Sequence, residues 1–354
     1  MSYKVLQKLI TLCPILILGF NVNLQAQTSN NAELVILNWS EYIDPDIIKK
    51  FELKYKTRIR QIYFESDDSR DEMLLENNGS GYDLVVSSGR AIRTYRKRGW
   101  LEPINKAQVP NLRHINKKWL DAFESSAGYS VPYFWGTLGI AYRKDLVNTE
   151  ITSWKQLLEP DDSLHQKILM ANSVDDVLSV ALKSLGFSSN SHNKDEYKLA
   201  EELLLRQKKH VNDYTYLALN EDSALVKGNI HVSMAYSGDA LMLMEIEPEI
   251  KYVVPVEGGG LWVDYFTVMK KSTNKKLAFK FIDFINEPEN AAKIAEYVYY
   301  ATPNTAAEKL LPEDFLTDTT IYPDKKTLEI SEFNRPLPAK IKRYKNNIFN
   351  NLTN

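Results

Sequence analysis

The chain has 354 residues, of which 44% are hydrophobic and 25% charged, and its formal net charge is −2 at pH 7. These values are typical of a globular protein, and the length predicts two domains. The near-neutral charge excludes a protein whose whole surface is built to bind nucleic acid or an anionic membrane, so any selectivity for charge must be local.

The first 26 residues are predicted to be a secretory signal peptide. Lys4 and Lys8 flank a short apolar run, "LITLCPILILGF", and Ala26 offers a cleavage site. The apolar run is too short and wrongly flanked for a lasting membrane span, although a permanent anchor is the alternative interpretation. Cys13 is the only cysteine and lies in this segment, so the mature chain would hold no disulfide and no cysteine nucleophile. We therefore expect an exported protein of the periplasm.

Strand-like and helix-like segments alternate through the rest of the chain, which predicts an α/β architecture of mainly parallel sheets covered by helices. Asp44 is predicted to cap a helix whose first residue is Pro45. No repeat or flexible linker is present, so continuous strands are expected to join the two domains. The predicted strands are 34–38, 58–64, 82–88, 167–171, 231–237, 252–256 and 264–269, and the predicted helices are 45–55, 68–77, 90–99, 153–160, 174–186, 195–209, 275–286, 288–300, 304–311 and a Lys-rich tail.

Patterns for catalysis and for metal or cofactor binding are missing from the sequence. The five histidines have no metal-ligand spacing, no GxSxG motif is present, and "EGGGLW" at 257–262 is neither a phosphate-binding loop nor a dinucleotide motif. We therefore expect no cofactor, no metal and no catalytic residue. The alternative is a hydrolase or transferase that uses Glu41 or Asp264 as a general base.

Aromatic and acidic residues recur together near the predicted strand ends. Each could have a local role in the core or at a helix N-terminus. Taken together they predict a ligand site, because the carboxyl ends of strands in open α/β sheets line binding crevices. The residues are Trp39, Glu41 and Tyr42; Tyr236 and Asp239; Trp262 and Asp264; with Asp176 at a helix start and Tyr300 near a helix end.

The chemistry of these residues favours a cationic ligand with an aliphatic chain. One carboxylate about 4 Å from a unit positive charge contributes about 4 kcal/mol before desolvation, at an effective dielectric constant near 20. A helix N-terminus opposes a cation by only about 0.3–1 kcal/mol. Aromatic faces add about 0.5–2 kcal/mol and cover methylene groups. A bare metal ion would need only oxygen ligands, so the set predicts an organic ammonium.

At these residues the sequence resembles the periplasmic spermidine/putrescine-binding proteins of ABC importers, over roughly residues 33–334. The stretches "LNWSEYIDPDIIKKFE", "VPYFWGTLGIAYRKD", "MAYSGDA" and "VEGGGLWVDYFTVMKK" carry much of the resemblance. It implies the following ligand-binding residues: Trp39, Ser40, Glu41, Tyr42, Ser88, Asp176, Tyr236, Asp239, Trp262, Asp264, Tyr300 and Asn334.

Two positions depart from the family pattern. Arg90 falls where several members have an aromatic residue, and Ser173 falls where some members have an aspartate. An inward-facing Arg90 would repel a polyamine, whereas it could also turn outward or pair with a neighbouring acid. A ligand with a carboxylate at one end would be a further possibility. Both residues are therefore candidates for ligand-facing positions.

The resemblance also implies a two-lobed fold of the type II-like binding proteins, with crossover strands near Thr137 and Trp262. Lobe 1 is expected to comprise 27–137 and 263–310, and lobe 2 to comprise 138–262 and 311–354. The implied partners are a polyamine ligand and either an inner-membrane ABC permease or a membrane-bound sensor. The protein is expected to be a monomer and to bind no nucleic acid.

Overall fold

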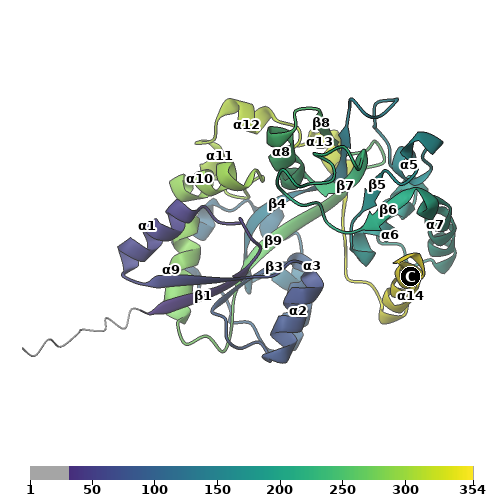
Figure 1. Cartoon of the computed structure of the whole chain (residues 1–354). Helices are drawn as coiled ribbons and strands as arrows, with labels where there is room; N and C mark the ends of the chain where they lie inside the picture. The colour runs from purple at the N-terminus through teal and green to yellow at the C-terminus, as the bar shows by residue number, and fades with distance from the viewer. Residues whose placement is uncertain (1–31, 354) are drawn as a thin grey trace, which may run out of the picture. The chain divides into compact units, whose positions relative to one another are not determined.

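A mixed sheet of ten strands runs through the computed structural model, which describes residues 32–353 (Figure 1). The predicted signal peptide lies outside these residues. Along the sheet the strand order is β2-β1-β3-β9-β4-β7-β5-β6, with β10 paired to β9 and β8 paired to β4. The strands are β1 (Glu33–Asn38), β2 (Arg58–Tyr63), β3 (Leu84–Ser88), β4 (Ser130–Arg143), β5 (Ile168–Met170), β6 (Val211–Tyr214), β7 (Val232–Tyr236), β8 (Ile250–Val253), β9 (Gly260–Val268) and β10 (Glu332–Phe333).

Helices connect the strands and cover both faces of the sheet. Between residues 32 and 353, no helix is both long and apolar enough to cross a bilayer. The α-helices are α1 (Pro45–Tyr55), α2 (Asp67–Glu76), α3 (Gly89–Lys97), α4 (Lys117–Leu120), α5 (Trp154–Leu158), α6 (Val174–Ser184), α7 (Lys194–Gln207), α8 (Ser237–Ile246), α9 (Lys275–Ile285), α10 (Pro288–Val298), α11 (Thr305–Glu308), α12 (Glu313–Thr317), α13 (Lys325–Ile330) and α14 (Ala339–Thr353). Short 3₁₀ helices are η1 (Lys106–Gln108), η2 (Pro110–His114), η3 (Glu124–Ser126), η4 (Asp162–Leu164) and η5 (Lys208–His210).

The long strand β4 joins the two halves of the sheet. All fourteen of its residues are buried. Its first part pairs antiparallel with β9, and its second part pairs antiparallel with β7 and β8. Thr137 pairs with Leu261 and Gly136 pairs with Trp262, so the two predicted crossover positions lie next to each other in the sheet.

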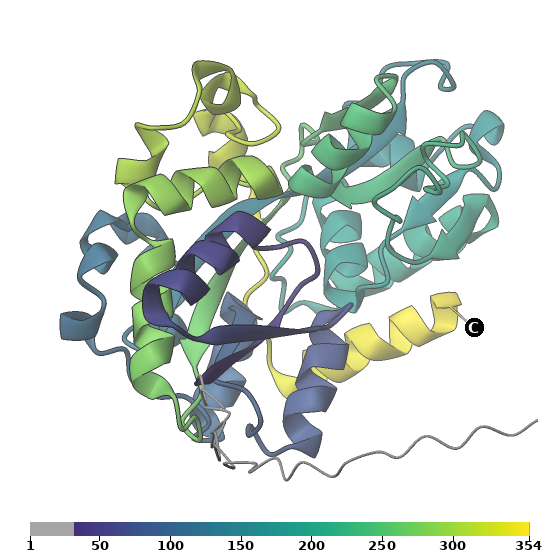
Figure 2. The same ribbon diagram turned by 60° about the vertical axis from the view of Figure 1, so that its left-hand side comes forward.

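Each half of the sheet has its own apolar core on both faces, which gives the two-lobed α/β fold that the sequence predicts. In β1, Leu34 and Ile36 pack with α1 and α9, whereas Val35 and Leu37 pack in a second cluster on the opposite face. Figure 2 shows α1 (purple) and α9 (light green) lying against the same face of the sheet. The alternation follows from the two-residue period of a strand.

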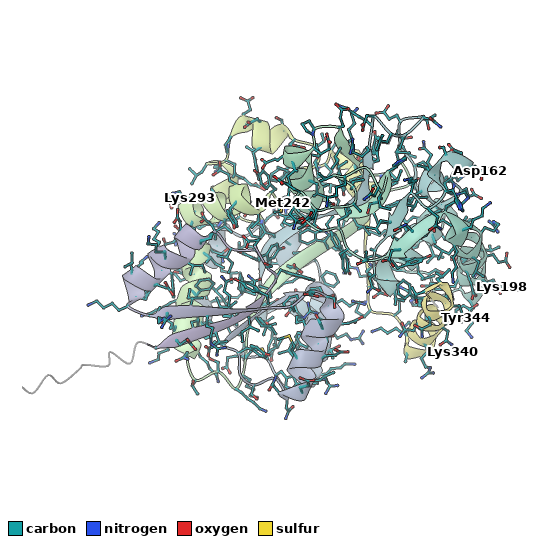
Figure 3. The ribbon with its side chains drawn as sticks, in the orientation of Figure 1. Asp162, Lys198, Met242, Lys293, Lys340 and Tyr344 are labelled. Carbon is teal, nitrogen blue, oxygen red and sulfur yellow. The ribbon has the colours of Figure 1, made fainter. Side chains whose placement is uncertain are left out.

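The second half of the sheet repeats this arrangement. The alternate β4 residues Ile140 and Tyr142 pack in the core that includes α5, α6 and α7, whereas Ala141 faces the cluster beneath α8. Helix α14 completes this lobe, and the ring of its Tyr344 lies 6.5 Å from the ring of Tyr197 on α7. Figure 3 labels Tyr344 on α14 and Lys198 on the neighbouring α7.

The α/β fold is confirmed, and two details differ from the sequence prediction. Strand β9 begins at Gly260 and not at the predicted residue 264, so Trp262 and Asp264 both lie inside the strand. The elements that the sequence did not predict are the strands β4, β6 and β10 and the helices α4, α8, α12 and α13. The segment after residue 311 contributes Ile321 to a core of the first half of the sheet and Ile341 to a core of the second half. The predicted lobe boundaries stay a prediction.

Candidate ligand-binding site

The turn between β1 and α1 presents two large aromatic side chains. Asp44 caps α1 by accepting a hydrogen bond from the backbone N–H of Asp46 at 2.8 Å, and Pro45 is the first helical residue, as predicted. Glu41 has φ 52°, a left-handed conformation that reverses the chain within the turn. The Trp39 ring packs on Phe64 with centroids 4.4 Å apart. Tyr42 is buried and points toward β9.

Tyr42 and Asp264 form the first acid–tyrosine pair. The Tyr42 hydroxyl donates to Oδ2 of Asp264 at 3.2 Å. Asp264 is only 9% exposed to solvent. Burial, together with the nearby charge of Asp67, raises the pKa of Asp264 to about 7. Because burial also raises the pKa of Tyr42 well above its ordinary value, the tyrosine remains the proton donor of the pair.

Tyr300 and Asp239 form the second pair. The Tyr300 hydroxyl donates to Oδ1 of Asp239 at 2.9 Å. Asp239 is the third residue of α8, where the helix N-terminus favours a negative charge. Burial nevertheless raises the pKa of Asp239 to about 6, against the lowering effect of the hydrogen bond from Tyr300. This carboxyl group is therefore charged at neutral pH and desolvated.

Tyr236 and Asp176 form the third pair. The Tyr236 hydroxyl donates to Oδ2 of Asp176 at 2.8 Å, and Nδ2 of Asn334 donates to Oδ1 at 3.2 Å. Asp176 is the third residue of α6. The Ser173 hydroxyl accepts a hydrogen bond from the backbone N–H of Asp176 at 3.3 Å, so Ser173 acts as the N-cap of this helix.

Trp262 lies between two of these pairs. Its ring meets the Tyr300 ring edge-on at 4.7 Å and the Tyr236 ring at 6.2 Å. Two glycines make room for the rings, because a Cβ at Gly136 would lie 2.6 Å from Trp262 and one at Gly238 would lie 2.4 Å from Tyr300. Nε1 of Trp262 is buried and has no hydrogen-bond partner among residues 32–353.

These contacts join residues from five segments into one group, which we call the acid–aromatic cluster. Tyr42 belongs to it through its ring, 6.0 Å from that of Tyr300. Within residues 32–353, none of the three acids of the cluster forms an ion pair with a Lys, Arg or His side chain. The cluster consists of Tyr42, Asp176, Tyr236, Asp239, Trp262, Asp264 and Tyr300.

Glu41 and Ser40 lie on the exposed side of the turn. The Glu41 carboxylate accepts a hydrogen bond from the Tyr297 hydroxyl of α10. No hydrogen bond within the described part of the chain joins Glu41 to the acid–aromatic cluster. Their predicted contact with a ligand stays a prediction.

Ser88 and Arg90 meet the carboxylate of Asp67 beside the cluster. The Ser88 hydroxyl donates to Oδ2 of Asp67 at 3.0 Å, and Nη2 of Arg90 donates to the same oxygen at 3.3 Å. Nη1 of Arg90 forms an ion pair with Asp175. Arg90 thus pairs with neighbouring acids, one of the arrangements that the sequence left open. Burial opposes the charged form of Asp67, but Arg70 and Arg90 outweigh it and lower the pKa of Asp67 to about 2.

A separate hollow of about 830 Å³ is less suited to a cation than the acid–aromatic cluster is. It is lined by Ser153, Lys183 and Glu332 among other residues, and it contains no acid of the acid–aromatic cluster. Its Lys183 and Glu332 neutralise each other, with Nζ 3.2 Å from Oε1. Within 32–353, no group of three His, Cys, Asp or Glu residues could hold a metal ion. We therefore take the acid–aromatic cluster as the candidate site.

Residues 46–323, more than half of the chain, match the family of bacterial extracellular solute-binding proteins. The chain belongs to this family. The resemblance that the sequence analysis found is thereby confirmed, since it named a group of periplasmic solute-binding proteins.

Similar proteins agree with this assignment of a solute-binding protein. The spermidine/putrescine-binding periplasmic protein of Salmonella typhimurium is 31% identical over 312 residues, which are 87% of this chain and 88% of that protein. The norspermidine sensor of Vibrio cholerae is 29% identical over 318 residues, 87% of each chain. The crystal structure of a spermidine/putrescine ABC transporter substrate-binding protein from Streptococcus pneumoniae is 28% identical, covers 91% of this chain and 98% of its own, and superposes with a TM-score of 0.80.

Three residues beside the site of this solute-binding protein were missed by the sequence analysis. Asp67 binds Ser88 and Arg90, Asp175 binds Arg90, and Lys345 of α14 donates to Oδ1 of Asp175 at 2.6 Å. Asp67 and Asp175 are first-turn acids of α2 and α6, which is a common position for an acid. The signal that could have drawn attention was the pair of adjacent aspartates after Val174.

Proposed function

We propose that this solute-binding protein binds a polyamine of the spermidine/putrescine class in the periplasm and delivers it to the membrane permease of an ABC importer. The observation that carries the proposal is the set of three carboxylates in the acid–aromatic cluster, none with a cationic partner within residues 32–353. The names of the relatives support the same ligand class. An enzymatic role is not part of this proposal.

Unpaired buried carboxylates are unfavourable in the absence of a ligand. Burial raises the pKa values of Asp239 and Asp264 to about 6 and about 7, which reflects the cost of removing their charges from water. An ammonium group that replaces water at these oxygens supplies the missing counter-charge, about 4 kcal/mol at 4 Å before its own desolvation. A cationic ligand therefore supplies the counter-charge that these carboxylates do not receive from residues 32–353.

The rings of the cluster favour a cation that carries methylene groups. The Trp262 ring lies nearly perpendicular to the rings of Tyr300 and Tyr236, so neither of these rings is stacked parallel on it. A ring face attracts an ammonium by about 0.5–2 kcal/mol and packs against the aliphatic chain that follows it. An alkylamine satisfies both the acids and the rings, whereas a bare metal ion would satisfy the acids alone.

Residues from both halves of the sheet form the site, so a bound ligand can change how the two halves are arranged and thereby signal to a membrane partner that the site is filled. Tyr42 comes from the first half, whereas Asp176 and Tyr236 come from the second. A ligand that contacts Tyr42 and also Asp176 and Tyr236 binds more tightly when the two halves are close together than when they are apart. This difference in affinity shifts the protein toward the closed arrangement. The partner in the membrane would recognise that arrangement. We propose that the protein acts as a monomer after removal of residues 1–26.

A periplasmic receptor that reports polyamine concentration to a membrane-bound signalling protein is the second candidate. It shares the ligand and the site, and the relative from Vibrio cholerae described as a norspermidine sensor favours it. Uptake of radiolabelled polyamine by cells with and without the protein separates the two functions. Loss of uptake in the deletion strain supports the importer, whereas normal uptake with altered gene expression supports the receptor.

Titration calorimetry of the chain from residue 27 onward with putrescine and with spermidine tests the binding function. The proposal expects saturable one-site binding of at least one of them at micromolar concentration and a higher melting temperature when it is bound. Absence of both heat and thermal stabilisation at millimolar amine would refute the proposal. Turnover of either amine would instead favour the enzymatic alternative with Glu41 or Asp264 as base.

A further inference from the structure

Arg90 joins two carboxylates that come from different lobes. Its Nη2 lies 3.3 Å from Oδ2 of Asp67, the first residue of α2, and its Nη1 pairs with Asp175, the second residue of α6. Carboxylates form strong charge-assisted hydrogen bonds with guanidinium and with ammonium groups, so two converging carboxylates can hold either cation. Here the cation is the protein's own guanidinium.

The location of Arg90 is not explained by helix stability. Arg90 is the second residue of α3, where the positive end of the helix disfavours a cation, and its side chain is 32% exposed. The acids Asp67 and Asp175 are each favoured in the first turn of their own helices. Three helix N-termini therefore converge on this point, and all three oppose an additional positive charge.

The acids around Arg90 are all paired with cationic side chains. Asp67 also pairs with Arg70, and Arg70 pairs in turn with Asp71 at 3.1 Å. Asp175 also pairs with Lys345, which is only 2% exposed to solvent. Asp67, Asp71 and Asp175 with Arg70, Arg90 and Lys345 make three acids and three cations, a net charge of zero, while the Lys345 amine is protonated. Burial and the charge of Arg90 lower the pKa of that amine to about 7, so the balance holds below pH 7. We call these six residues the Arg90 network.

The Arg90 network forms one end of the acid–aromatic cluster. Asp175 immediately precedes Asp176 of the cluster. Ser88, which donates to Asp67, pairs with Asp264 in the register of β3 and β9. One end of the site is therefore neutral and contains a fixed cation, whereas the acids of the cluster are free of cationic partners in the described residues.

We propose that the site selects a diamine and that Arg90 excludes a third ammonium group. The inference rests on the proposed polyamine-binding function and narrows its ligand. The two ammonium groups of a diamine pair with carboxylates of the acid–aromatic cluster, and its methylenes cover Trp262. A triamine that extends beyond Asp176 brings its third charge to Arg90, where no acid is left to neutralise it.

Calorimetry at pH 6.5, where Lys345 is mostly protonated, with 1,4-diaminobutane and with spermidine tests this selectivity in wild type and in Arg90→Gln. We expect wild type to bind the diamine at least tenfold more tightly than spermidine. Arg90→Gln leaves one net negative charge at this end, so the affinity for spermidine should rise at least tenfold more than the affinity for the diamine does.

Two further variants separate the position of the charge from its presence. Arg93→Gln removes an exposed positive charge from the same helix and should keep the wild-type selectivity. Arg90→Lys keeps a cation at the site and should also retain the preference for the diamine. Melting temperatures confirm that each variant is folded.

Spermidine that binds wild type as tightly as the diamine would overturn the inference, and this measurement needs no variant. An unchanged ratio of affinities in folded Arg90→Gln would overturn it as well. Binding of neither amine by wild type would refute the proposed function itself, and the inference with it.

Discussion

The Tyr42 hydroxyl donates a hydrogen bond to Oδ2 of Asp264 at 3.2 Å, across 222 residues of sequence. This contact joins the turn after β1 to the interior of β9. It explains why the short turn contains bulky residues, since Tyr42 must reach from the end of one strand to the side chain of another. Its ring also lies 6.0 Å from the Tyr300 ring, so one residue connects the turn with two acid–tyrosine pairs.

Replacement of Asp264 by Asn is predicted to weaken amine binding at least tenfold, or about 1.4 kcal/mol. The substitution keeps the shape of the side chain and an acceptor for Tyr42 but removes the counter-charge of a buried ammonium. Calorimetry measures the change. Asp213→Asn, at an exposed position of β6, is the matched control and should bind as wild type does. Equal affinity of Asp264→Asn and wild type would contradict the assigned role.

The same Asp264→Asn variant is predicted to be more stable than wild type when no ligand is bound. The pKa of Asp264 is raised to about 7, so the folded state holds this proton more tightly than the unfolded state does. The stabilisation from the proton is present below about pH 4 and is lost as the pH rises through about 7. The Asn variant avoids this loss. Linkage places the upper limit near 4 kcal/mol.

Urea unfolding of both proteins at pH 4 and pH 8 measures this difference. The Asn variant should gain at least about 1 kcal/mol over wild type at pH 8 relative to pH 4. A constant difference between the two pH values would mean that Asp264 does not titrate in this range.

Amine affinity is predicted to increase with pH between 5 and 8. The ligand requires ionised carboxylates, and the pKa values of Asp239 and Asp264 without ligand are raised to about 6 and about 7. Bound ammonium groups lower both pKa values, so binding releases protons in this range. We expect at least a tenfold gain in affinity from pH 5.5 to pH 8. Calorimetry in buffers of different ionisation enthalpy counts the protons released, and a count of zero throughout would disprove the coupling.

Gly238→Ala is predicted to weaken binding without weakening α8. The added Cβ would lie 2.4 Å from the Tyr300 ring, so Tyr300 must move away from Asp239. Alanine itself is a better helix former than glycine, by about 1 kcal/mol. Gly260→Ala is the control, because the nearest atom to its Cβ is 3.3 Å away, in the side chain of Leu138. We expect at least a fivefold loss of affinity for Gly238→Ala only, and equal binding by both variants would be inconsistent with a role for Tyr300.

Much of the fold could be predicted from the sequence because its elements follow simple periods. Helix α1 has the predicted bounds because Asp44 and Pro45 define its start. Strand β4 was missed because it is buried along its whole length and contains Pro132, Gly136 and Gly139, so neither alternation nor a continuous run of strand formers is present. The glycines there are explained by contacts with distant rings, such as Gly136 with Trp262.

The candidate site was predictable where residue type alone indicates chemistry. The acids and rings of the acid–aromatic cluster were recognised because they recur together near predicted strand ends, where open α/β sheets bind ligands. The pairing of Arg90 could not be predicted, since its partners Asp67 and Asp175 lie on helices far apart in sequence. An acid in the first turn of a helix looks the same whether it stabilises that helix or holds a cation from another lobe.

A crystal structure of the protein with 1,4-diaminobutane most directly tests the claim that the unpaired carboxylates hold the ligand. Our account predicts ammonium nitrogens within hydrogen-bond distance of carboxylates of the acid–aromatic cluster, including Asp264, with the methylenes against Trp262. A diamine that instead occupies the hollow beside Lys183 and Glu332, with Asp176, Asp239 and Asp264 free of it, would contradict the account.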